Sequence, residues 1–194
     1  MENKYDPAIH HRRSIRLQCY DYTQIGLYFI TICCHDKICY FGKIENGEIV
    51  LNDFGKIAYN ELVKLPERYP DVLSDVFQIM PNHVHAIIEI VGATLAVAQN
   101  TDSIRTEMHV GTRAGASPAP TVQYTVGNII GAYKSRVANQ CLEILKFHNK
   151  HMGKLWQRNY YEHIIRNDES YHNIVDYIIN NPVNWEKDKL YMDC

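Results

Sequence analysis

The order of strand-like and helix-like segments constrains the fold of this 194-residue chain more than any other feature. A buried strand, GLYFITICC, is predicted for residues 26–34. An amphipathic helix follows, with Asp53 as its candidate N-cap and Pro66 as its stop. The later predicted elements are a strand over 71–80, a strand over 83–91, a helix of about twenty residues within 126–148, a strand over 160–166 and a helix from about Ser170 to Asn181.

The first six of these elements follow the order βαββαβ, which is the ferredoxin-like arrangement. We therefore predict an α+β fold in which a ferredoxin-like core with an antiparallel sheet is extended by a C-terminal helix. The dipeptide Asn46-Gly47, between short apolar-rich segments, also predicts a β-hairpin.

Composition favours one globular domain over residues 1–194, since 46% of the residues are hydrophobic. Residues 92–121 are rich in Gly, Ala, Ser, Thr and Pro and are predicted to form a flexible insertion. No apolar run reaches the roughly 18 residues that span a bilayer, and the N-terminus has no signal-peptide core, so we expect a cytoplasmic protein without a membrane partner.

The six cysteines include no C-x-x-C pair and are expected to be reduced.

Two histidines in MPNHVHAIIEI, residues 80–90, are candidate metal ligands. His83 and His85 point to the same face if the segment is a strand, because side chains alternate with a period of two. Their spacing fits two ligands of a divalent cation, but H-x-H is a short and common pattern that more often places a pair of polar groups on a solvated strand face.

The last helix offers a second candidate pair. Tyr177 and Asn181 are four residues apart and share a helix face. A tyrosine at such a position normally packs against the core. A nucleophilic role would require a cation beside an electrophilic phosphorus, which His83 and His85 could hold.

Charge is unevenly distributed along the chain, although the net charge is only −2. Residues 131–166 contain seven lysines and arginines against two acidic residues. This basic stretch fits a phosphate-containing partner, and it also fits an ordinary solvated helix.

Three blocks of the sequence together resemble the signature blocks of REP-associated tyrosine transposases, which belong to the HUH superfamily of single-strand nucleases. They are MPNHVHAII, WQRNYYEHIIRN and YHNIVDYIINNPVNW, in this order. The opening RRSIRLQCYDYTQIGLYFIT is also similar to the start of that family. The resemblance covers essentially the whole chain outside residues 92–121.

The resemblance implies a metal-dependent endonuclease and strand transferase acting on single-stranded DNA. Carried over by position, His83 and His85 are metal ligands, Asn181 is the third ligand or a neighbour of the metal, and Tyr177 is the nucleophile. The implied reaction leaves a 5′-phosphotyrosine and a free 3′-hydroxyl, with Mg²⁺ or Mn²⁺ as the cofactor. The implied partner is single-stranded DNA with hairpins of repetitive extragenic palindromes, bound by a monomer or a homodimer.

Seven basic residues are expected to bind DNA. An N-terminal group would clamp the foot of the hairpin, and a second group would line the phosphate track. The first group is Arg12, Arg13 and Arg16, and the second is Lys134, Arg136, Arg158 and Arg166.

Two alternatives to this function remain open from the sequence. One is a non-catalytic protein that binds DNA or RNA hairpins. The other is a metal-dependent hydrolase that uses His83 and His85 to activate water.

Overall fold

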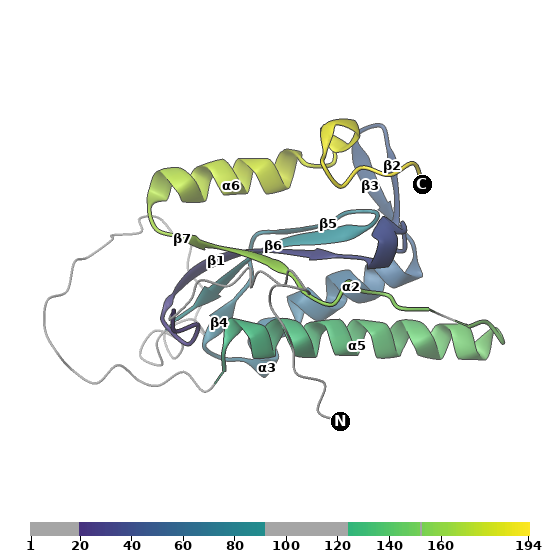
Figure 1. Cartoon of the computed structure of the whole chain (residues 1–194), viewed down its shortest axis with the longest axis horizontal. Coiled ribbons are helices and arrows are strands. Elements are labelled where there is room, and N and C mark those ends of the chain that lie inside the picture. The colour runs from purple at the N-terminus through teal and green to yellow at the C-terminus, as the bar shows by residue number, and fades with distance from the viewer. Residues whose placement is uncertain (1–19, 92–123, 152) are drawn as a thin grey trace, which may run out of the picture.

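The computed structural model describes residues 20–91, 124–151 and 153–194, and its main element is an antiparallel sheet (Figure 1). Strand β1 (Gly26–Cys33) lies in the middle, between β6 (His83–Ile90) and β7 (Tyr161–Ile165). The other side of β6 pairs with β4 (Val72–Leu73) and β5 (Phe77–Ile79). This sheet confirms the predicted α+β class.

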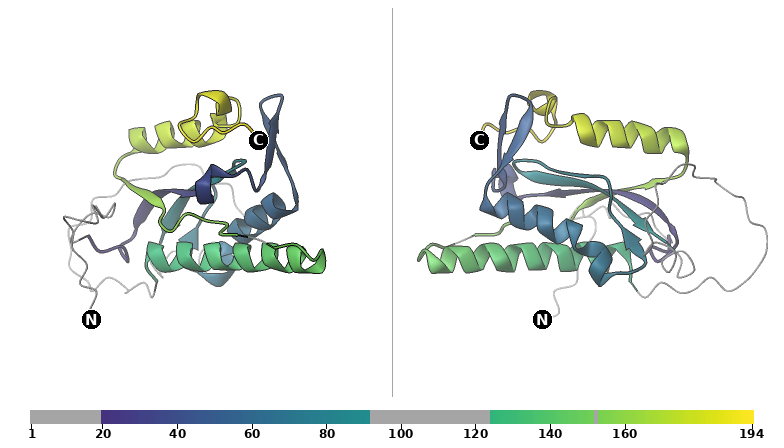
Figure 2. Two further views of the ribbon diagram at one scale, coloured as in Figure 1. Left: turned by 45° about the vertical axis from the view of Figure 1, so that its right-hand side comes forward. Right: turned by 180° about the vertical axis from the view of Figure 1, so that it is seen from behind.

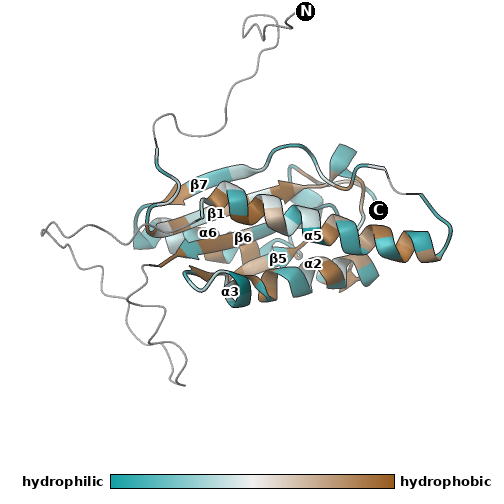
Figure 3. Cartoon of the chain, turned by 90° about the horizontal axis from the view of Figure 1, so that it is seen from below, coloured by the Kyte–Doolittle hydropathy of each residue, from teal (hydrophilic) through white to brown (hydrophobic). Residues whose placement is uncertain are grey.

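Helices lie on both faces of the sheet (Figures 1 and 2). The pair α2 (Asp53–Val63) and α5 (Val126–Phe147) covers one face, with the short α3 (Leu65–Arg68) beside α2. Helix α6 (Asp168–Asn180) covers the opposite face. Figure 3, seen from the α5 side, shows hydrophilic and hydrophobic residues mixed along α5, as expected for an amphipathic helix.

Smaller elements complete the description. The predicted hairpin is present as β2 (Gly42–Glu45) and β3 (Glu48–Leu51), which form a separate two-stranded sheet. Two 3₁₀ turns, η1 (His35–Lys37) and η3 (Trp185–Lys187), were not predicted.

Side-chain alternation divides the apolar residues into two cores. From β1 and β6, residues such as Tyr28, Ile30 and Val84 point towards α2 and α5 and are fully buried in the larger core. On the other face, Ile87, Ile165 and Ile178 form a smaller core under α6. Because the larger core takes the residues on one face of β6, the first residues on the other face, which points towards α6, can be polar.

Element boundaries differ from the sequence predictions in three places. Asn52, and not Asp53, caps α2, since its side chain accepts a hydrogen bond from the backbone N–H of Gly55. Helix α6 begins at Asp168, before Ser170, because Asn167 provides its cap. The strand predicted over 71–80 is divided into β4 and β5.

The expectation that all cysteines are reduced is wrong for one pair. Cys39 and Cys194 form a disulfide that joins positions 155 residues apart. The three remaining described cysteines, Cys33, Cys34 and Cys141, are free and buried.

Some predictions fall outside the described residues. These are the flexible insertion over 92–121 and the DNA-binding roles of Arg12, Arg13 and Arg16. Within the described ranges, none of the helices is both long and apolar enough to cross a membrane.

Candidate metal centre and adjacent tyrosine

The two histidines of β6 project together from the α6 face of the sheet. His83 and His85 are both almost fully buried, and their Nε2 atoms lie 2.9 Å apart. The solvated strand face considered from the sequence is therefore wrong for these side chains. Their burial follows from the strand period of two together with the cover provided by α6 and the segment after it.

Hydrogen bonds at the Nδ1 atoms fix the orientation of the two rings. Asn82 Nδ2 donates to the carbonyl oxygens of Lys37 and Leu190, at 3.0 and 2.8 Å. Asn82 Oδ1 is therefore the acceptor for the Nδ1–H of His83, at 2.8 Å. As a result, Nε2 of His83 carries a lone pair that points towards His85.

The second ring is held by the neighbouring strand. Thr31 of β1 is the cross-strand partner of His85, and its hydroxyl lies 2.9 Å from Nδ1 of His85. When Thr31 accepts this hydrogen bond, Nε2 of His85 is also an acceptor. Two imidazole lone pairs then face the same point, which is how metal-binding histidines are oriented by their outer partners.

A carboxylate completes the cluster from a segment that the sequence prediction did not use. Asp188 directly follows the 3₁₀ turn η3 and provides a carboxylate oxygen within 4.8 Å of ligand atoms of both histidines. Its Oδ1 accepts a 2.6 Å hydrogen bond from the backbone N–H of Leu190. Its Oδ2 accepts a 2.7 Å hydrogen bond from Nδ2 of Asn181.

Tyr177 reaches this cluster from α6. Its hydroxyl lies 3.3 Å from Nε2 of His85 and donates to Oδ2 of Asp188 at 3.2 Å. The ring packs edge-on against His85 and Phe29. The side chain is still 45% exposed, so the hydroxyl is both in contact with the cluster and accessible from outside.

Asn181 lies at the cluster as its spacing from Tyr177 predicted. It is the C-cap of α6 and is buried. Its nitrogen is used by Asp188, whereas its Oδ1 is buried without a hydrogen-bond partner among the described residues. A buried oxygen without a partner is an unsatisfied acceptor that a cation or a hydrogen-bond donor would stabilise.

The electrostatics of the cluster keep both rings neutral. Burial lowers the pKa of His83 to about 4, against the opposing effects of Asp188 and Asn181. Burial, followed by repulsion from His83, lowers the pKa of His85 well below its usual value. Neutral imidazole is the form that binds metal ions.

The acidic and phenolic groups are also shifted. Burial opposes ionisation of Asp188, but hydrogen bonds from Asn181 and Leu190 outweigh it and lower the pKa of the carboxyl. Burial, and then the charge of Asp188, raise the pKa of Tyr177 to about 12. The phenol is therefore protonated at neutral pH unless positive charge is added nearby.

The donor set fits a divalent cation. Two neutral imidazole nitrogens and one carboxylate lie within 4.8 Å of one another. Asn181, whose Oδ1 is unpaired, is joined to the same carboxylate through its Nδ2. Sequence reasoning found the histidines and Asn181 but missed Asp188, whose segment, NWEKDKL, has the mixed charge of a solvated tail.

Two of the basic residues predicted to bind DNA lie away from this cluster. Lys134 and Arg136 belong to α5, which covers the opposite face of the sheet from α6. The Lys134 ammonium donates to the carbonyl oxygens of Gln157 and Arg158, and more weakly to that of Asn159. Arg136, Arg158 and Arg166 are exposed.

Comparison with known proteins yields relatives but no matching family model. An uncharacterized protein of Haemophilus influenzae (strain Rd) is 42% identical over 193 residues, which cover all of both chains. A second protein of the same organism, provisionally named a REP-associated tyrosine transposase, is 26% identical over 164 residues, 84% of this chain and 73% of that protein. The solved structure of a REP-associated tyrosine transposase bound to a REP hairpin matches 87% of this chain and 73% of its own, with a TM-score of 0.52 and 17% identity.

These findings define a class of protein: an α+β chain with the fold of a REP-associated tyrosine transposase and transposase-like relatives. Within that class, the chain belongs to the same family as the 42% identical protein of Haemophilus influenzae.

Proposed function

We propose that this protein is a metal-dependent endonuclease and strand transferase for single-stranded DNA, in which Tyr177 is the nucleophile. The observation that carries the proposal is the position of the Tyr177 hydroxyl, 3.3 Å from His85 and 3.2 Å from Asp188. A phenol that is partly exposed and in contact with a cluster of metal-binding groups has the arrangement that nucleophilic attack on phosphorus requires.

His83, His85 and Asp188 would hold the cation, with Asn181 Oδ1 as a further candidate ligand. Mg²⁺ or Mn²⁺ is the expected ion, and it would polarise the scissile phosphate and favour the ionised phenol. A nearby positive charge is needed for the second effect, because the pKa of Tyr177 is raised to about 12 without it.

The protein groups then perform a transesterification. The Tyr177 oxygen forms a bond to phosphorus while the bond from phosphorus to the 3′-oxygen breaks, which leaves a 5′-phosphotyrosine. The phenol proton passes first to Asp188, its hydrogen-bond acceptor, and is finally carried by the leaving 3′-hydroxyl. The same hydroxyl can later attack the phosphotyrosine, so strands are rejoined without an added energy source.

The proposed substrate is single-stranded DNA that contains a hairpin of the repetitive extragenic palindrome type. The solved relative with the same fold is bound to a REP hairpin, which supports this assignment. In this chain, Arg12, Arg13 and Arg16 are proposed to bind the hairpin foot. Arg136, Arg158 and Arg166 are exposed and are proposed to contact phosphates outside the cluster.

The test uses single-stranded hairpin DNA from the flanks of the host gene, labelled at its 3′ end. With Mn²⁺, the wild-type protein should form an adduct that survives denaturation and carries the 3′ label. Tyr177→Phe should form no adduct and should not cut. Tyr161→Phe is a matched control, because Tyr161 is an exposed tyrosine on β7 outside the cluster.

Two results would contradict the proposal. Cleavage by Tyr177→Phe would indicate a hydrolase in which the cluster activates water, since His83, His85 and Asp188 would serve that reaction as well. Binding of the hairpin without any cleavage, with Mg²⁺ or with Mn²⁺, would indicate a hairpin-binding protein.

A further inference from the structure

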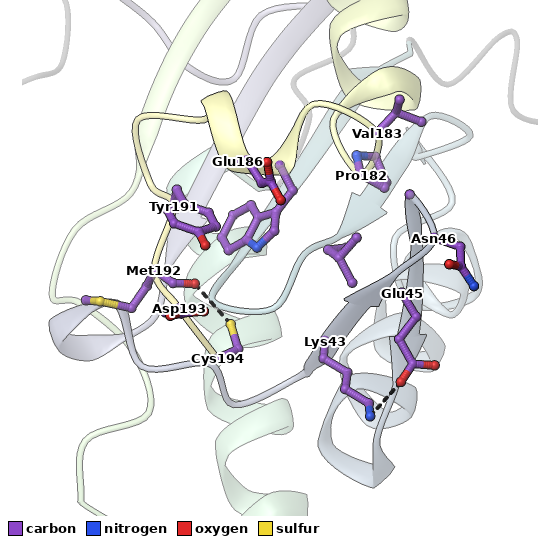
Figure 4. Close-up of a pocket in the computed structure, with 13 residues that line it drawn as sticks. Lys43, Glu45, Asn46, Pro182, Val183, Glu186, Tyr191, Met192, Asp193 and Cys194 are labelled. Carbon is purple, nitrogen blue, oxygen red and sulfur yellow. Dashed lines mark hydrogen bonds and ion pairs between the residues drawn. The ribbon is translucent and has the colours of Figure 1, made fainter.

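A pocket of about 530 Å³ lies between the β2–β3 hairpin and the C-terminal segment, residues 181–194 (Figure 4). Trp185 and Tyr191 line it from the C-terminal segment, and Ile44, Glu45 and Asn46 line it from the hairpin. Figure 1 shows the same two segments side by side at the end of α6. None of the residues assigned to the chemistry of the cluster lines this pocket.

One aromatic ring separates the pocket from the metal centre. Trp185 lines the pocket, and its ring centroid is 5.9 Å from that of His83. The turn that carries Trp185 is followed directly by Asp188. A group bound in the pocket would therefore be separated from the occupant of the cluster by the Trp185 ring.

The charge of the pocket disfavours a phosphate as its occupant. It is lined by one lysine and three carboxylates, and Lys43 is paired with Glu45 at 2.6 Å. The carboxylates of Glu186 and Asp193 remain without an ion pair among the described residues. These acceptors would repel a phosphate and attract N–H donors.

The aromatic and acidic residues that line the pocket suit a heterocyclic base. Tyr191 is 40% exposed, and its ring packs edge-on against Trp185 with centroids 5.4 Å apart. Unpaired bases stack on aromatic side chains and use their Watson–Crick edges for hydrogen bonds. Adenine, guanine and cytosine have amino groups that can donate to a carboxylate, whereas thymine has none.

We propose that this pocket binds one unpaired, amino-bearing base of the DNA strand, near the scissile phosphate at the cation that His83, His85 and Asp188 would hold. The inference rests on the proposed function for the identity of the strand. It adds a specificity site, in which Glu186 or Asp193 accepts a hydrogen bond from the amino group and Tyr191 stacks on the base.

The experiment measures binding in the Tyr177→Phe background with Mg²⁺, so that cleavage does not interfere. The probes are a fluorescein-labelled short oligothymidylate and three versions in which one central thymine is replaced by adenine, guanine or cytosine. Fluorescence anisotropy should show at least one amino-bearing probe binding about tenfold more tightly than oligothymidylate.

Two sets of variants test separately the carboxylates and the aromatic ring of the pocket. The double substitution Glu186→Gln and Asp193→Asn changes exposed side chains and should reduce the preference to less than about twofold. Tyr191→Ala should weaken binding of the preferred probe by about tenfold. The matched controls are Glu67→Gln, an exposed carboxylate of α3, and Tyr59→Ala, which is 46% exposed and has its ring 5.2 Å from that of Phe77.

Equal affinity for all four probes would overturn the proposal. So would a preference that survives the double substitution, or a loss with Tyr59→Ala as large as that with Tyr191→Ala. These outcomes are distinct from failure of the proposed function. A protein that binds the probes with the expected preference but never forms a Tyr177 adduct would have the base pocket and lack the nuclease activity.

Discussion

The hydroxyl of Tyr177 donates a 3.2 Å hydrogen bond to Oδ2 of Asp188, although the end of α6 and the turn η3 separate the two residues in the chain. Asn181 donates to the same oxygen at 2.7 Å. One carboxylate thus joins the phenol to the C-cap of the helix that carries it, and lies beside both histidines. Asp188 therefore contributes, after burial, to the pKa shifts of both histidines and of Tyr177.

Replacing Asp188 with Asn should weaken binding of Mn²⁺ by at least about 100-fold, because a charged ligand is lost while the size of the side chain is kept. The same change should lower the pKa of Tyr177, because the negative charge that raises it is removed. Calorimetric titration with Mn²⁺ measures the first effect and ultraviolet titration of the phenol measures the second. Asp176→Asn, at an exposed position of α6, is the control and should change neither. Unchanged affinity in Asp188→Asn would exclude this residue as a ligand.

The stability of the metal-free protein should fall as the pH drops from about 6.5 to about 4. His83 is neutral in the folded protein down to about pH 4, whereas the unfolded chain takes up a proton near pH 6.5. Unfolding therefore binds protons in this range. The contribution of neutral His83 to the free energy of unfolding is complete above about pH 6.5 and is lost progressively as the pH falls to about 4. The change for His83 alone is about 3 kcal/mol. His85, whose pKa is also lowered, should add to the slope.

Urea unfolding in EDTA at several pH values measures this effect. The double substitution His83→Asn and His85→Asn should remove most of the slope between pH 4 and 6.5. An equal slope in the double variant would assign the acid sensitivity to other groups.

The disulfide between Cys39 and Cys194 should hold the C-terminal segment against the body of the protein. Asp188 lies in the same segment, which is also held by hydrogen bonds from Asn82 to Leu190 and from Lys37 to Lys189. Cys194→Ser should lower the free energy of unfolding by about 2–4 kcal/mol. It should also weaken Mn²⁺ binding, because Asp188, the proposed carboxylate ligand, becomes less well ordered.

Reduction of the wild-type protein with dithiothreitol should reproduce the effect of Cys194→Ser. The reductant should have no further effect on the Cys194→Ser variant, which serves as the control. Thermal unfolding at matched protein concentration measures the stability of the wild-type protein and of the variant, with and without the reductant, and calorimetric titration measures their Mn²⁺ affinity. A wild-type protein whose stability and Mn²⁺ affinity do not change on reduction would contradict this role of the disulfide.

The parts of the centre that follow local periodicity could be predicted from the sequence. His83 and His85 share a face because strand side chains alternate, and Tyr177 and Asn181 share one because a helix repeats after about four residues. The antiparallel sheet also followed from the succession of elements, since the order βαββαβ indicates a ferredoxin-like core.

Asp188 and the disulfide could not be predicted in this way, because both depend on where an irregular segment packs. The turn η3 has no sustained hydrophobic period, and its position is set by contacts of Asn82 and Lys37 with backbone carbonyls far along the chain. Cys39 and Cys194 are 155 residues apart, and no local spacing pairs them. The division of the 71–80 strand likewise reflects its pairing with β6, which propensity does not encode.

Two glycines in helices should respond in opposite directions to replacement by alanine. Alanine favours an exposed helix by up to about 1 kcal/mol over glycine. At Gly131 of α5, an added Cβ would meet no atom within 4 Å, so Gly131→Ala should stabilise the protein by about this amount. At Gly55 of α2, the Cβ would lie 2.1 Å from the carbonyl oxygen of Phe41. This backbone must move to accept it, so Gly55→Ala should destabilise the protein by about 1–3 kcal/mol. Urea unfolding of both variants measures the difference, and stabilisation by Gly55→Ala would show that the packing of α2 on the Phe41 backbone is looser than described.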